Sequence, residues 1–407
     1  MLPDVVARDR VAGRSAIQVD SFSLVFPGPV ARFRLARTTL RARVPAAEAW
    51  FRSLTAGDHR AREVSLICPP EWCHRALADP LLTSATLETL ALGECRFSDA
   101  GTAAASASAS ASRLTDLSLS RTHISEAALQ SLLSGCPALR NVIFRHIQGP
   151  RRIRITSCRS LVLFGVWHYK HREEHTVEDA PRLECLLGDV HLGASVTIIG
   201  APKLTALGYL VVGFRNFFHG IDKPAVEEKV NKGLRAPFNS VKILAISMTF
   251  SSKKDMATVM NLLKCFSFLE TLHIQGKPGE RQVDTFDFGY YQKNEPIGCI
   301  VNHLKTVRLE SKVKNLIGEV EERNMFEFVC FLLANAQVLQ IMKIQSAMSN
   351  TPTWITEQQN LIQCHRASVE AKVVFEGLKV VHRKRFSIEA VNALPDPFDS
   401  DIDIMGY

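Results

Sequence analysis

The chain has 407 residues, of which 46% are hydrophobic and 22% are charged, and its formal net charge at pH 7 is +8. This length and composition are ordinary for a soluble protein with a large core, and the positive charge permits a nucleic acid or an acidic protein as partner without establishing either. The 10 cysteines include no Cys-x-x-Cys pair, which argues against a disulfide framework and for reduced thiols in an intracellular protein.

The N-terminal part of the chain predicts short elements that alternate between strand and helix. Residues 1–20 are polar and rich in arginine, and they lack the basic start and apolar run of a secretory signal. Residues 19–40 contain two apolar runs on either side of a Pro-Gly-Pro turn, which predicts a strand, a turn and a strand. Residues 46–54 then predict a helix, and residues 62–68 predict a further strand.

The dominant pattern of the chain is L-x-x-L-x-L, which is first clear at Leu87, Leu90 and Leu92. It returns with variations at Leu114, Leu117 and Leu119; Leu139, Val142 and Phe144; Leu183, Leu186 and Leu187; Leu204, Leu207 and Leu210; Leu269, Leu272 and Ile274; Leu304, Val307 and Leu309; and, more loosely, Val338, Ile341, Met342 and Ile344.

The physical interpretation of one such unit is a short strand followed by a turn. Residues two apart point to the same face of a strand, and one unit cannot cover its own apolar face. Stacked units bury one another's leucines, so a period of ~20–29 residues predicts an α/β leucine-rich-repeat solenoid, a horseshoe of irregular strand-helix repeats. The alternative is an ordinary set of buried strands in an α/β domain, and the recurrence in register favours the solenoid.

The segments between the repeat strands predict three helices and one loop. Ser125 is expected to cap the first helix, which ends at Gly135. Residues 252–264 and 324–335 predict the second and third helices. Residues 102–112 alternate alanine with serine and bury little, so we expect a flexible, protruding loop there.

The most apolar window of the chain is residues 196–214. It is long enough to consider as a membrane span, but Pro202 and Lys203 interrupt it, so two strands joined by a turn are expected and no membrane anchor. The polar residues 213–237 are expected to interrupt the repeats. Beyond residue 344 the pattern predicts a helix around Trp354 and a last strand at the end of the repeats.

Few residue clusters indicate chemistry. His168, His171 and His175 have a spacing that could suit a metal, but no cysteine or carboxylate cluster accompanies them, and an exposed charged loop is favoured. Arg152 and Arg154 are expected on the solvated face of a strand, without the aromatic series of a nucleic-acid site. No catalytic or phosphate-binding motif is present, so we expect no enzymatic activity, no cofactor and no metal.

Four stretches resemble a known family, namely residues 26–35 (FPGPVARFRL), 180–210, 303–344 and 396–398 (DPF). Over residues 19–400 the chain is similar to the plant F-box proteins that carry leucine-rich repeats and a C-terminal FBD region, most of all to the grass members. In that family a three-helix F-box precedes the repeats and binds the Skp1-type adaptor of a cullin ubiquitin ligase. Here only the segment LPDVV, near the start, resembles an F-box opening, so the comparison implies a chain that lacks most or all of the F-box.

The pattern and the resemblance together predict four segments. Residues 1–20 are expected to be a remnant N-terminal segment without a full F-box, and residues 21–290 a leucine-rich-repeat domain. Residues 291–376 are expected to be an FBD-like C-terminal repeat region, and residues 377–407 a basic and then acidic tail that is partly disordered.

The function that follows is recognition of a target protein without catalysis, in the nucleus or cytoplasm. The resemblance implies the substrate receptor of a Skp1-cullin-F-box ubiquitin ligase, with Skp1-type adaptor binding only when an F-box is present. A solenoid binds partners on its concave face, where we expect the following residues: Thr89, Ala91, Asp116, Ser118, Asn141, Ile143, Thr271, His273, Thr306 and Arg308.

Two alternatives remain open at this point. One is a nucleic-acid-binding or scaffolding protein that works through its basic surface, which a steep loss of affinity with salt would indicate. The other is a remnant that folds poorly because the N-terminal cap of its solenoid is lost. No membrane partner is expected, and the resemblance makes a nucleic-acid partner the less favoured one.

Overall fold

A computed structural model of the chain describes residues 4–8, 32–36, 61–67, 79–82, 84–108, 113–156, 158–167, 174–190, 195–212, 216–220, 238–277, 286, 288, 296–311, 319–346, 364–377 and 396–398. The chain divides into two compact units. The first comprises Met1–Leu183 and Val196–Pro202, and the second comprises Glu184–Ser195 and Lys203–Tyr407.

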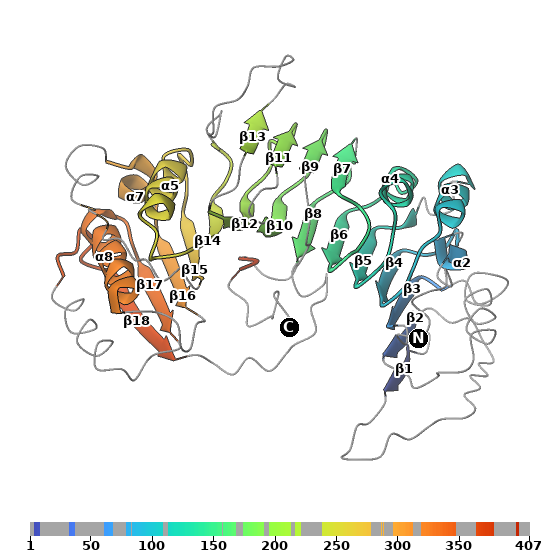
Figure 1. Cartoon of the computed structure of the whole chain (residues 1–407), viewed down its shortest axis with the longest axis horizontal. Coiled ribbons are helices and arrows are strands. Elements are labelled where there is room, and N and C mark those ends of the chain that lie inside the picture. Colours follow the sequence, from blue (N-terminus) through green and yellow to red (C-terminus); the bar gives the residue numbers. More distant parts are fainter. Residues whose placement is uncertain are drawn as a thin grey trace. The chain divides into compact units, whose positions relative to one another are not determined.

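The first unit contains a parallel sheet whose strands follow one another in chain order (Figure 1). These strands are β1 (Asp4–Arg8), β2 (Arg32–Ala36), β3 (Glu63–Ile67), β4 (Thr89–Gly93), β5 (Asp116–Ser120), β6 (Asn141–Arg145) and β8 (Leu163–Trp167). Neighbouring strands pair so that Leu90, Leu117 and Val142 form one buried row. This row is the stacking of apolar side chains that the repeat predicts.

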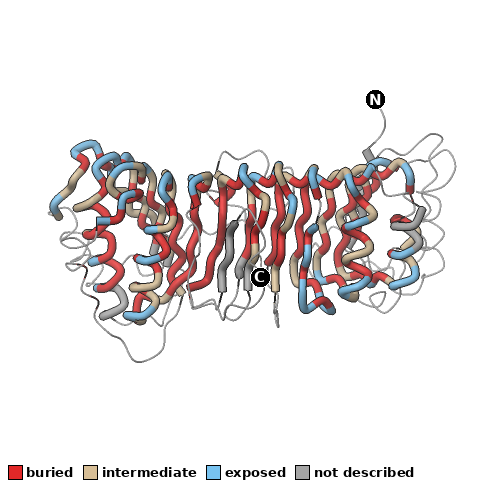
Figure 2. Tube along the Cα trace, turned by 90° about the horizontal axis from the view of Figure 1, so that it is seen from above, coloured by how far each residue is buried: buried red, intermediate tan, exposed pale blue. Residues whose placement is uncertain are grey.

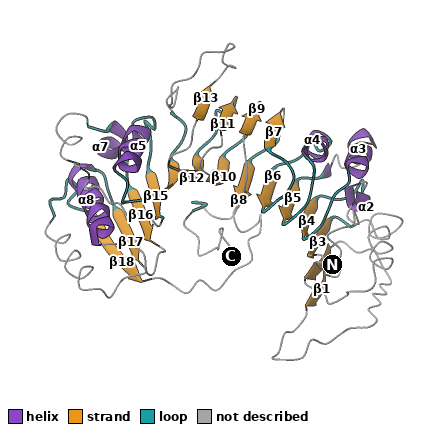
Figure 3. Cartoon of the chain, in the orientation of Figure 1, coloured by secondary structure: helices purple, strands orange, loops and turns teal. Residues whose placement is uncertain are grey.

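One face of this sheet is covered by short helices and then by a second, smaller sheet. The helices are α2 (Asp79–Leu82), α3 (Asp99–Ser108) and α4 (Glu126–Ser134), and Figure 3 shows them on one side of the strands. The smaller sheet contains β7 (Arg152–Thr156), β9 (Glu174–Glu178) and β11 (Ser195–Ile199). On β7, Arg152 and Arg154 are exposed while Ile153 and Ile155 are buried, so the predicted alternation is confirmed.

Two segments of the first unit show how well local sequence predicted its helices. The helix after Ser125 is confirmed as α4, since the Ser125 hydroxyl accepts a hydrogen bond from the Ala128 N–H at 3.0 Å. The loop predicted at residues 102–112 is wrong as far as Ser108, because α3 occupies that part. Alanine has the highest helix propensity of all residues, and this preference outweighed the small side chains of the alternation.

The turns of the first unit repeat as regularly as its strands. The residues that follow β4, β5, β6 and β9 all have positive φ although none is glycine; they are Glu94, Arg121, His146 and Asp179. This conformation costs roughly 1–2 kcal/mol for such residues. Each of these residues donates its N–H to a carbonyl of the next coil, as Glu94 does to Ser120 at 2.9 Å, and that hydrogen bond offsets part of the cost.

The second unit repeats the arrangement with longer helices. Its parallel sheet contains β10 (Cys185–Val190), β12 (Ala206–Val211), β14 (Ile243–Met248), β15 (Thr271–Gly276), β16 (Thr306–Ser311), β17 (Ile341–Ser346) and β18 (Lys372–Gly377). The helices α5 (Lys253–Leu263), α7 (Gly298–Asn302) and α8 (Glu319–Asn335) lie on one side of these strands, and β13 (Asn216–Gly220) also belongs to this unit (Figure 1). Leu244, Leu272, Val307 and Met342 form a buried row.

The structure contains two repeats that are missing from the predicted series, and it changes the leading residue of the last predicted repeat. Residues 161–166 and 241–246 carry the pattern with Phe or Val in place of a leucine, and they form β8 and β14. In the last repeat the leading apolar residue is Leu339, which is buried, and not its exposed neighbour Val338. The strand register decides this point, because Ile341 pairs with Thr306. Leu339 stands two residues before Ile341, and Leu304, the leading leucine of the previous repeat, stands two residues before Thr306.

Most of the other predicted elements are confirmed. Residues 196–214 contain β11 and β12, and no described helix is long and apolar enough to cross a membrane. Residues 252–264 contain α5, and α8 begins five residues before the predicted start at 324. The predicted helices at residues 46–54 and around Trp354 lie outside the described residues.

Burial follows the strands in each unit. In Figure 2 the buried residues run along the strands, while exposed residues gather at turns and on helices. The expected class, an α/β fold of stacked strand-helix repeats, is therefore confirmed.

Candidate functional site

The face of each parallel sheet that the helices do not cover is formed by strand residues that alternate with core residues. We call this surface the helix-free face of the unit. All ten residues predicted to bind a protein lie on it, and they form rows across neighbouring strands. In the first unit they are Thr89, Ala91, Asp116, Ser118, Asn141 and Ile143, and in the second they are Thr271, His273, Thr306 and Arg308.

On β5 and β6 of the first unit the helix-free face carries a polar ladder. The Asn141 side-chain amide donates from Nδ2 to Oδ1 of Asp116 at 2.7 Å. The Thr115 hydroxyl lies 2.6 Å from Oδ2 of Asp116 and 3.0 Å from the carbonyl oxygen of Glu88. A hydroxyl has one proton, so it donates to one of these two acceptors at a time. Both oxygens of the Asp116 carboxylate are thus held in place by neighbours.

The other end of the Asn141 amide is not paired in the described part of the chain. Asn141 is only 8% exposed, and its Oδ1 has no hydrogen-bond partner among the described residues. The amide cannot be turned over to solve this, because Oδ1 would then face the Asp116 carboxylate. A buried acceptor without a donor costs about 1–3 kcal/mol.

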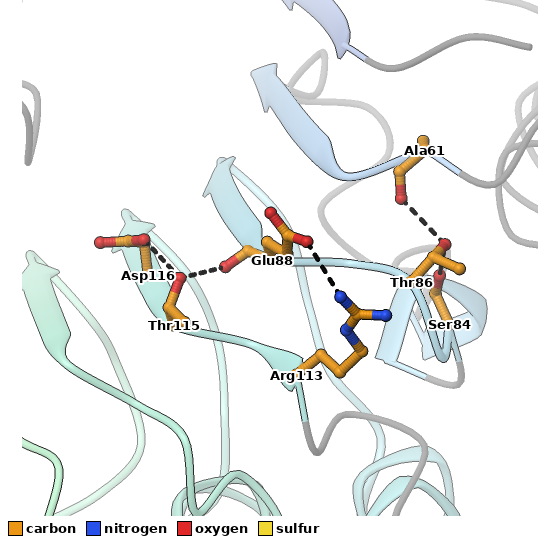
Figure 4. A network of polar contacts seen from close by, with 7 residues as sticks. All are labelled: Ala61, Ser84, Thr86, Glu88, Arg113, Thr115 and Asp116. Atoms are coloured by element: carbon orange, nitrogen blue, oxygen red, sulfur yellow. Dashed lines mark hydrogen bonds and ion pairs between the residues drawn. The ribbon is translucent and has the colours of Figure 1, made fainter.

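The ladder continues at the N-terminal ends of β4 and β5, where Glu88 contacts both Thr115 and Arg113 (Figure 4). The Arg113 guanidinium lies 3.4 Å from Oε1 of Glu88, and the Thr86 hydroxyl donates to the carbonyl oxygen of Ala61 at 3.2 Å. The ion pair is exposed, so it contributes little stability.

The accessible part of this face ends near β8. Ile143 is buried, and the Trp167 ring lies over the backbone of Gly165. A Cβ atom at position 165 would be 2.4 Å from Cζ3 of Trp167, so only glycine fits beneath the ring without movement. Thr89, Ala91, Asp116 and Ser118 remain half-buried. The helix-free face of the first unit is therefore accessible mainly along β4 and β5.

In the second unit the helix-free face is occupied by a segment near the C-terminus. His273 has a side chain only 4% exposed, and its Nε2 lies 2.8 Å from Oδ2 of Asp396. Phe398 is 4% exposed and packs its ring edge against Tyr209, with ring centroids 5.3 Å apart. Its centroid lies 5.6 Å from that of His273. Residues 396–398 belong to the predicted tail, and this part of it is packed on the sheet.

Charged groups on β16 border the same place. Arg308 and Glu310 form an ion pair at 3.2 Å with little exposure. Burial raises the pKa of the Tyr209 hydroxyl, and the negative charges of Glu310 and Asp396 raise it further, against the opposing effect of Arg308. Tyr209 therefore stays protonated at any physiological pH. Thr271 and Thr306, at the start of their strands, are half-buried.

The remaining reactive groups are buried and separate. Burial raises the pKa of the Cys95, Cys136 and Cys299 thiols to about 12 and that of Cys185 to about 11. No three His, Cys, Asp or Glu side chains in the described part of the chain lie close enough to hold a metal ion. Of the three histidines in the predicted loop, His175 lies on β9, and the other two are outside the described residues.

Sequence reasoning placed the strand positions correctly but did not connect the tail with the sheet. Tyr209, Asp396 and Phe398 were not among the predicted site residues. The signal in the sequence was the tripeptide Asp-Pro-Phe, which places a large apolar residue outside the leucine-rich repeats. Such a residue requires burial somewhere, but the sequence does not say against what.

Comparison with known families gives two matches. A family model described as the LRR repeats of FBD-associated F-box protein At5g56370 matches residues 47–274, which is more than half of the chain. A second one, described as FBD, matches residues 292–344, the stretch that contains α7, β16, α8 and β17. No curated protein matches the chain.

Proposed function

The chain belongs to the family of the leucine-rich repeats of FBD-associated F-box proteins, and from this premise we propose that it recognises a protein partner on the helix-free face of its first unit. The partner would be a target for ubiquitylation, and the chain would act as a substrate receptor in an F-box-type ubiquitin ligase. The two matched families support a role in protein interaction.

The observation that carries the proposal is the row of half-buried polar side chains on β4 and β5, in which Asn141 and Thr115 hold the Asp116 carboxylate in a fixed orientation. The half-buried Asp116 carboxylate presents acceptor lone pairs next to the half-buried Ser118 hydroxyl, which can donate or accept. A partner that offers backbone or side-chain N–H groups would complete the ladder. Specificity arises in this way because a segment without donors would leave the same acceptors buried and unpaired.

We further propose that the chain is not catalytic and acts inside the cell, in the nucleus or cytoplasm. Its buried, high-pKa thiols suit a reducing compartment. A nucleic-acid partner is the less favoured proposal, because Arg154 on β7 is already paired with Glu174 at 3.2 Å.

The first experiment is affinity capture with matched variants of the full chain. Asp116→Ala combined with Asn141→Leu removes the ladder, and Ala127→Arg combined with Ser134→Arg places charges on the exposed side of α4 as a control. Quantitative mass spectrometry should find partners that are retained by the wild type and the control and lost at least tenfold by the ladder variant. A partner set that is unchanged by the ladder variant would contradict the proposed surface.

The link to a ligase is tested separately with purified Skp1-type adaptor. The family places an F-box ahead of the repeats, so we expect adaptor binding when a family F-box is joined to this chain, and no adaptor binding to the chain without that addition. Binding of the adaptor to the chain alone would place an adaptor site within its own 407 residues.

A further inference from the structure

The segment Asp396–Phe398 has the geometry of a bound peptide. The Phe398 N–H donates to Oδ1 of Asp396 at 2.9 Å, which closes a turn around Pro397. The turn places the carboxylate and the aromatic ring on neighbouring parts of the same sheet surface, where both contact His273. Pro397 is also buried. Three consecutive residues thus present one charge and one ring in a fixed arrangement.

The sheet supplies one matching group for each feature of the segment. A carboxylate only accepts hydrogen bonds, so Nε2 of His273 carries the proton in its contact with Asp396. The carboxylate is only 20% exposed, so losing this donor would leave a largely desolvated charge. The Phe398 ring meets Tyr209 edge-on with an interplanar angle of 76°, an arrangement that aromatic pairs prefer.

Small side chains on β14 make room for the ring. Strand β14 lies between β12, which carries Tyr209, and β15, which carries His273. At the facing position β14 has Ala245, paired with His273, and two residues further it has Ser247. Both are buried. Larger residues at these two positions would fill the space between Tyr209 and His273. We call the site formed by Tyr209, Ala245, Ser247 and His273 the tail pocket.

We propose that the tail pocket is a binding site for an acidic-aromatic protein segment of the Asp-Pro-Phe type, and that the chain's own Asp396–Phe398 occupies it in cis until such a segment displaces it. The inference goes beyond the proposed function, which concerns the first unit, because it names the chemistry that the helix-free face of the second unit accepts in a partner. The two groups that the pocket binds are a carboxylate and, two residues later, an aromatic ring.

The extent to which the chain's own segment weakens binding of a free peptide can be estimated. Residues 378–395 connect the end of β18 to Asp396, so the segment and its pocket are parts of one chain. A ligand tethered by a linker of such length has an effective concentration in the millimolar range. A free peptide with an affinity of about 0.1 mM would then bind the wild-type chain about tenfold more weakly than a chain whose own segment is disabled.

The experiment uses the full chain and a fluorescein-labelled peptide of residues 394–401 (LPDPFDSD). In the disabled chain, Asp396→Ala and Phe398→Ala remove the carboxylate and the ring of the native segment. Fluorescence anisotropy should show saturable binding to the disabled chain and at least tenfold weaker binding to the wild type. Adding His273→Ala to the disabled chain should abolish binding. Peptides in which alanine replaces the residue equivalent to Asp396 or to Phe398 should bind neither chain.

Two outcomes would overturn the proposal. If the disabled chain keeps a cooperative thermal unfolding transition but does not bind the peptide, the segment is an ordinary part of the fold. If wild-type and disabled chains bind equally, the segment does not compete for the pocket. These results differ from a failure of the proposed function, which concerns partners lost with the Asp116 and Asn141 substitutions.

A measurement on the wild type decides the question if the disabled chain does not fold. Hydrogen exchange is followed by mass spectrometry with and without millimolar unlabelled peptide. Displacement should speed exchange in residues 396–398 and leave β12 and β15 as protected as before. No change at any peptide concentration up to the solubility limit would contradict the proposal.

Discussion

The helix-free faces of the two units have the same strand geometry but differ in what covers them. On β4 and β5 of the first unit, Thr89 and Ser118 are half-buried and available to a partner. On β14 and β15 of the second unit, the equivalent positions Ala245, Ser247 and His273 are buried, and Asp396 and Phe398 contact His273. An outward-facing strand position is therefore not by itself an accessible one.

The difference shows that the same strand repeat can form two kinds of surface. In the first unit, strand residues with short polar side chains leave acceptors such as Asn141 Oδ1 without a partner in the described residues. In the second unit, side chains of unequal size form a pocket with an aromatic wall and a hydrogen-bond donor. Binding by the first would depend on partner hydrogen bonds, whereas binding by the second would depend on displacing a segment that is already bound.

The largest expected effect comes from the same substitution on the two faces. Ser247→Asp buries a carboxyl group that must either stay protonated or lose its hydration, and a pKa rise of ~3 units corresponds to a loss of about 4 kcal/mol of unfolding free energy at neutral pH. Ser118→Asp, on the half-buried face, should cost less than about 1 kcal/mol. Urea denaturation of both variants checks the pair, and equal losses would mean that the two faces are equally covered.

A smaller loss of stability is expected from a substitution on β8, where the accessible face of the first unit ends. Gly165→Ala places a methyl group 2.4 Å from the buried Trp167 ring, so the ring must move, at a cost of about 1–3 kcal/mol. Gly298→Ala at the start of α7 is the control, because nothing lies within 4 Å of the new Cβ, and it should stabilise by about 0.5 kcal/mol. Loss of stability in both variants would indicate that crowding at Trp167 is not the cause.

A third comparison uses two glutamates that each precede a strand. Glu270 lies 2.7 Å from Lys305 and 3.1 Å from Lys242, and the hydrogen bonds from Lys305 and then Lys242 hold its pKa below the usual value of 4.5. A lowered folded-state pKa contributes stability above the unfolded pKa, and this contribution is lost as the pH falls through the lowered value. The Glu270 side chain is 31% exposed and its lysine partners are 58% and 46% exposed, so solvent screens the pairs and Glu270→Gln should cost no more than about 0.5–1 kcal/mol at pH 7.

The same cost should disappear once the pH falls below the lowered pKa of Glu270, where the carboxyl group of the wild type is protonated. Glu88→Gln in the first unit is the matched control, because the single Arg113 partner of Glu88 is 3.4 Å away and exposed, and its effect should be close to zero. Urea titrations across pH 3–7 compare the two variants. A Glu270→Gln effect that persists unchanged at low pH would contradict the electrostatic cause.

The smallest effect concerns reactivity and leaves stability unchanged. The Cys95 thiol has its pKa raised to about 12 by burial, so almost no thiolate exists at pH 8 and iodoacetamide cannot reach the sulfur. Cys265 in the second unit is half-exposed, and Lys264 partly opposes the rise of its pKa. Peptide mapping should show modification of Cys265 well before Cys95, and both should react once urea unfolds the chain. Rapid native labelling of Cys95 would mean that the first unit opens locally.

Errors in the predicted elements have identifiable physical causes. The repeats at residues 161–166 and 241–246 are missing from the predicted series, because each has another apolar residue at two of the three leucine positions. Phe164, Val166, Val241 and Ile246 are buried all the same. The helix α3 was predicted as a loop because its alanines and serines carry no apolar stripe, although alanine itself favours a helix. In the first case an apolar side chain of similar volume replaced leucine, and in the second the helix preference of alanine outweighed the lack of an apolar stripe.

The sequence by itself determined which strand residues enter the core. The spacing of Leu87, Leu90 and Leu92 and its later copies specifies a strand, a turn and a shared buried row, because residues two apart always share a face and one unit cannot bury its own leucines. It likewise identified the positions, such as Asp116 and His273, that point away from that core.

Only the tertiary structure decided which of those outward positions remain accessible. That Trp167 lies over Gly165, and that Phe398 rests between Tyr209 and His273, depends on contacts between residues far apart in the chain. Alternation within a strand carries no information about such contacts, because it fixes the direction of a side chain and not what the rest of the chain places above it.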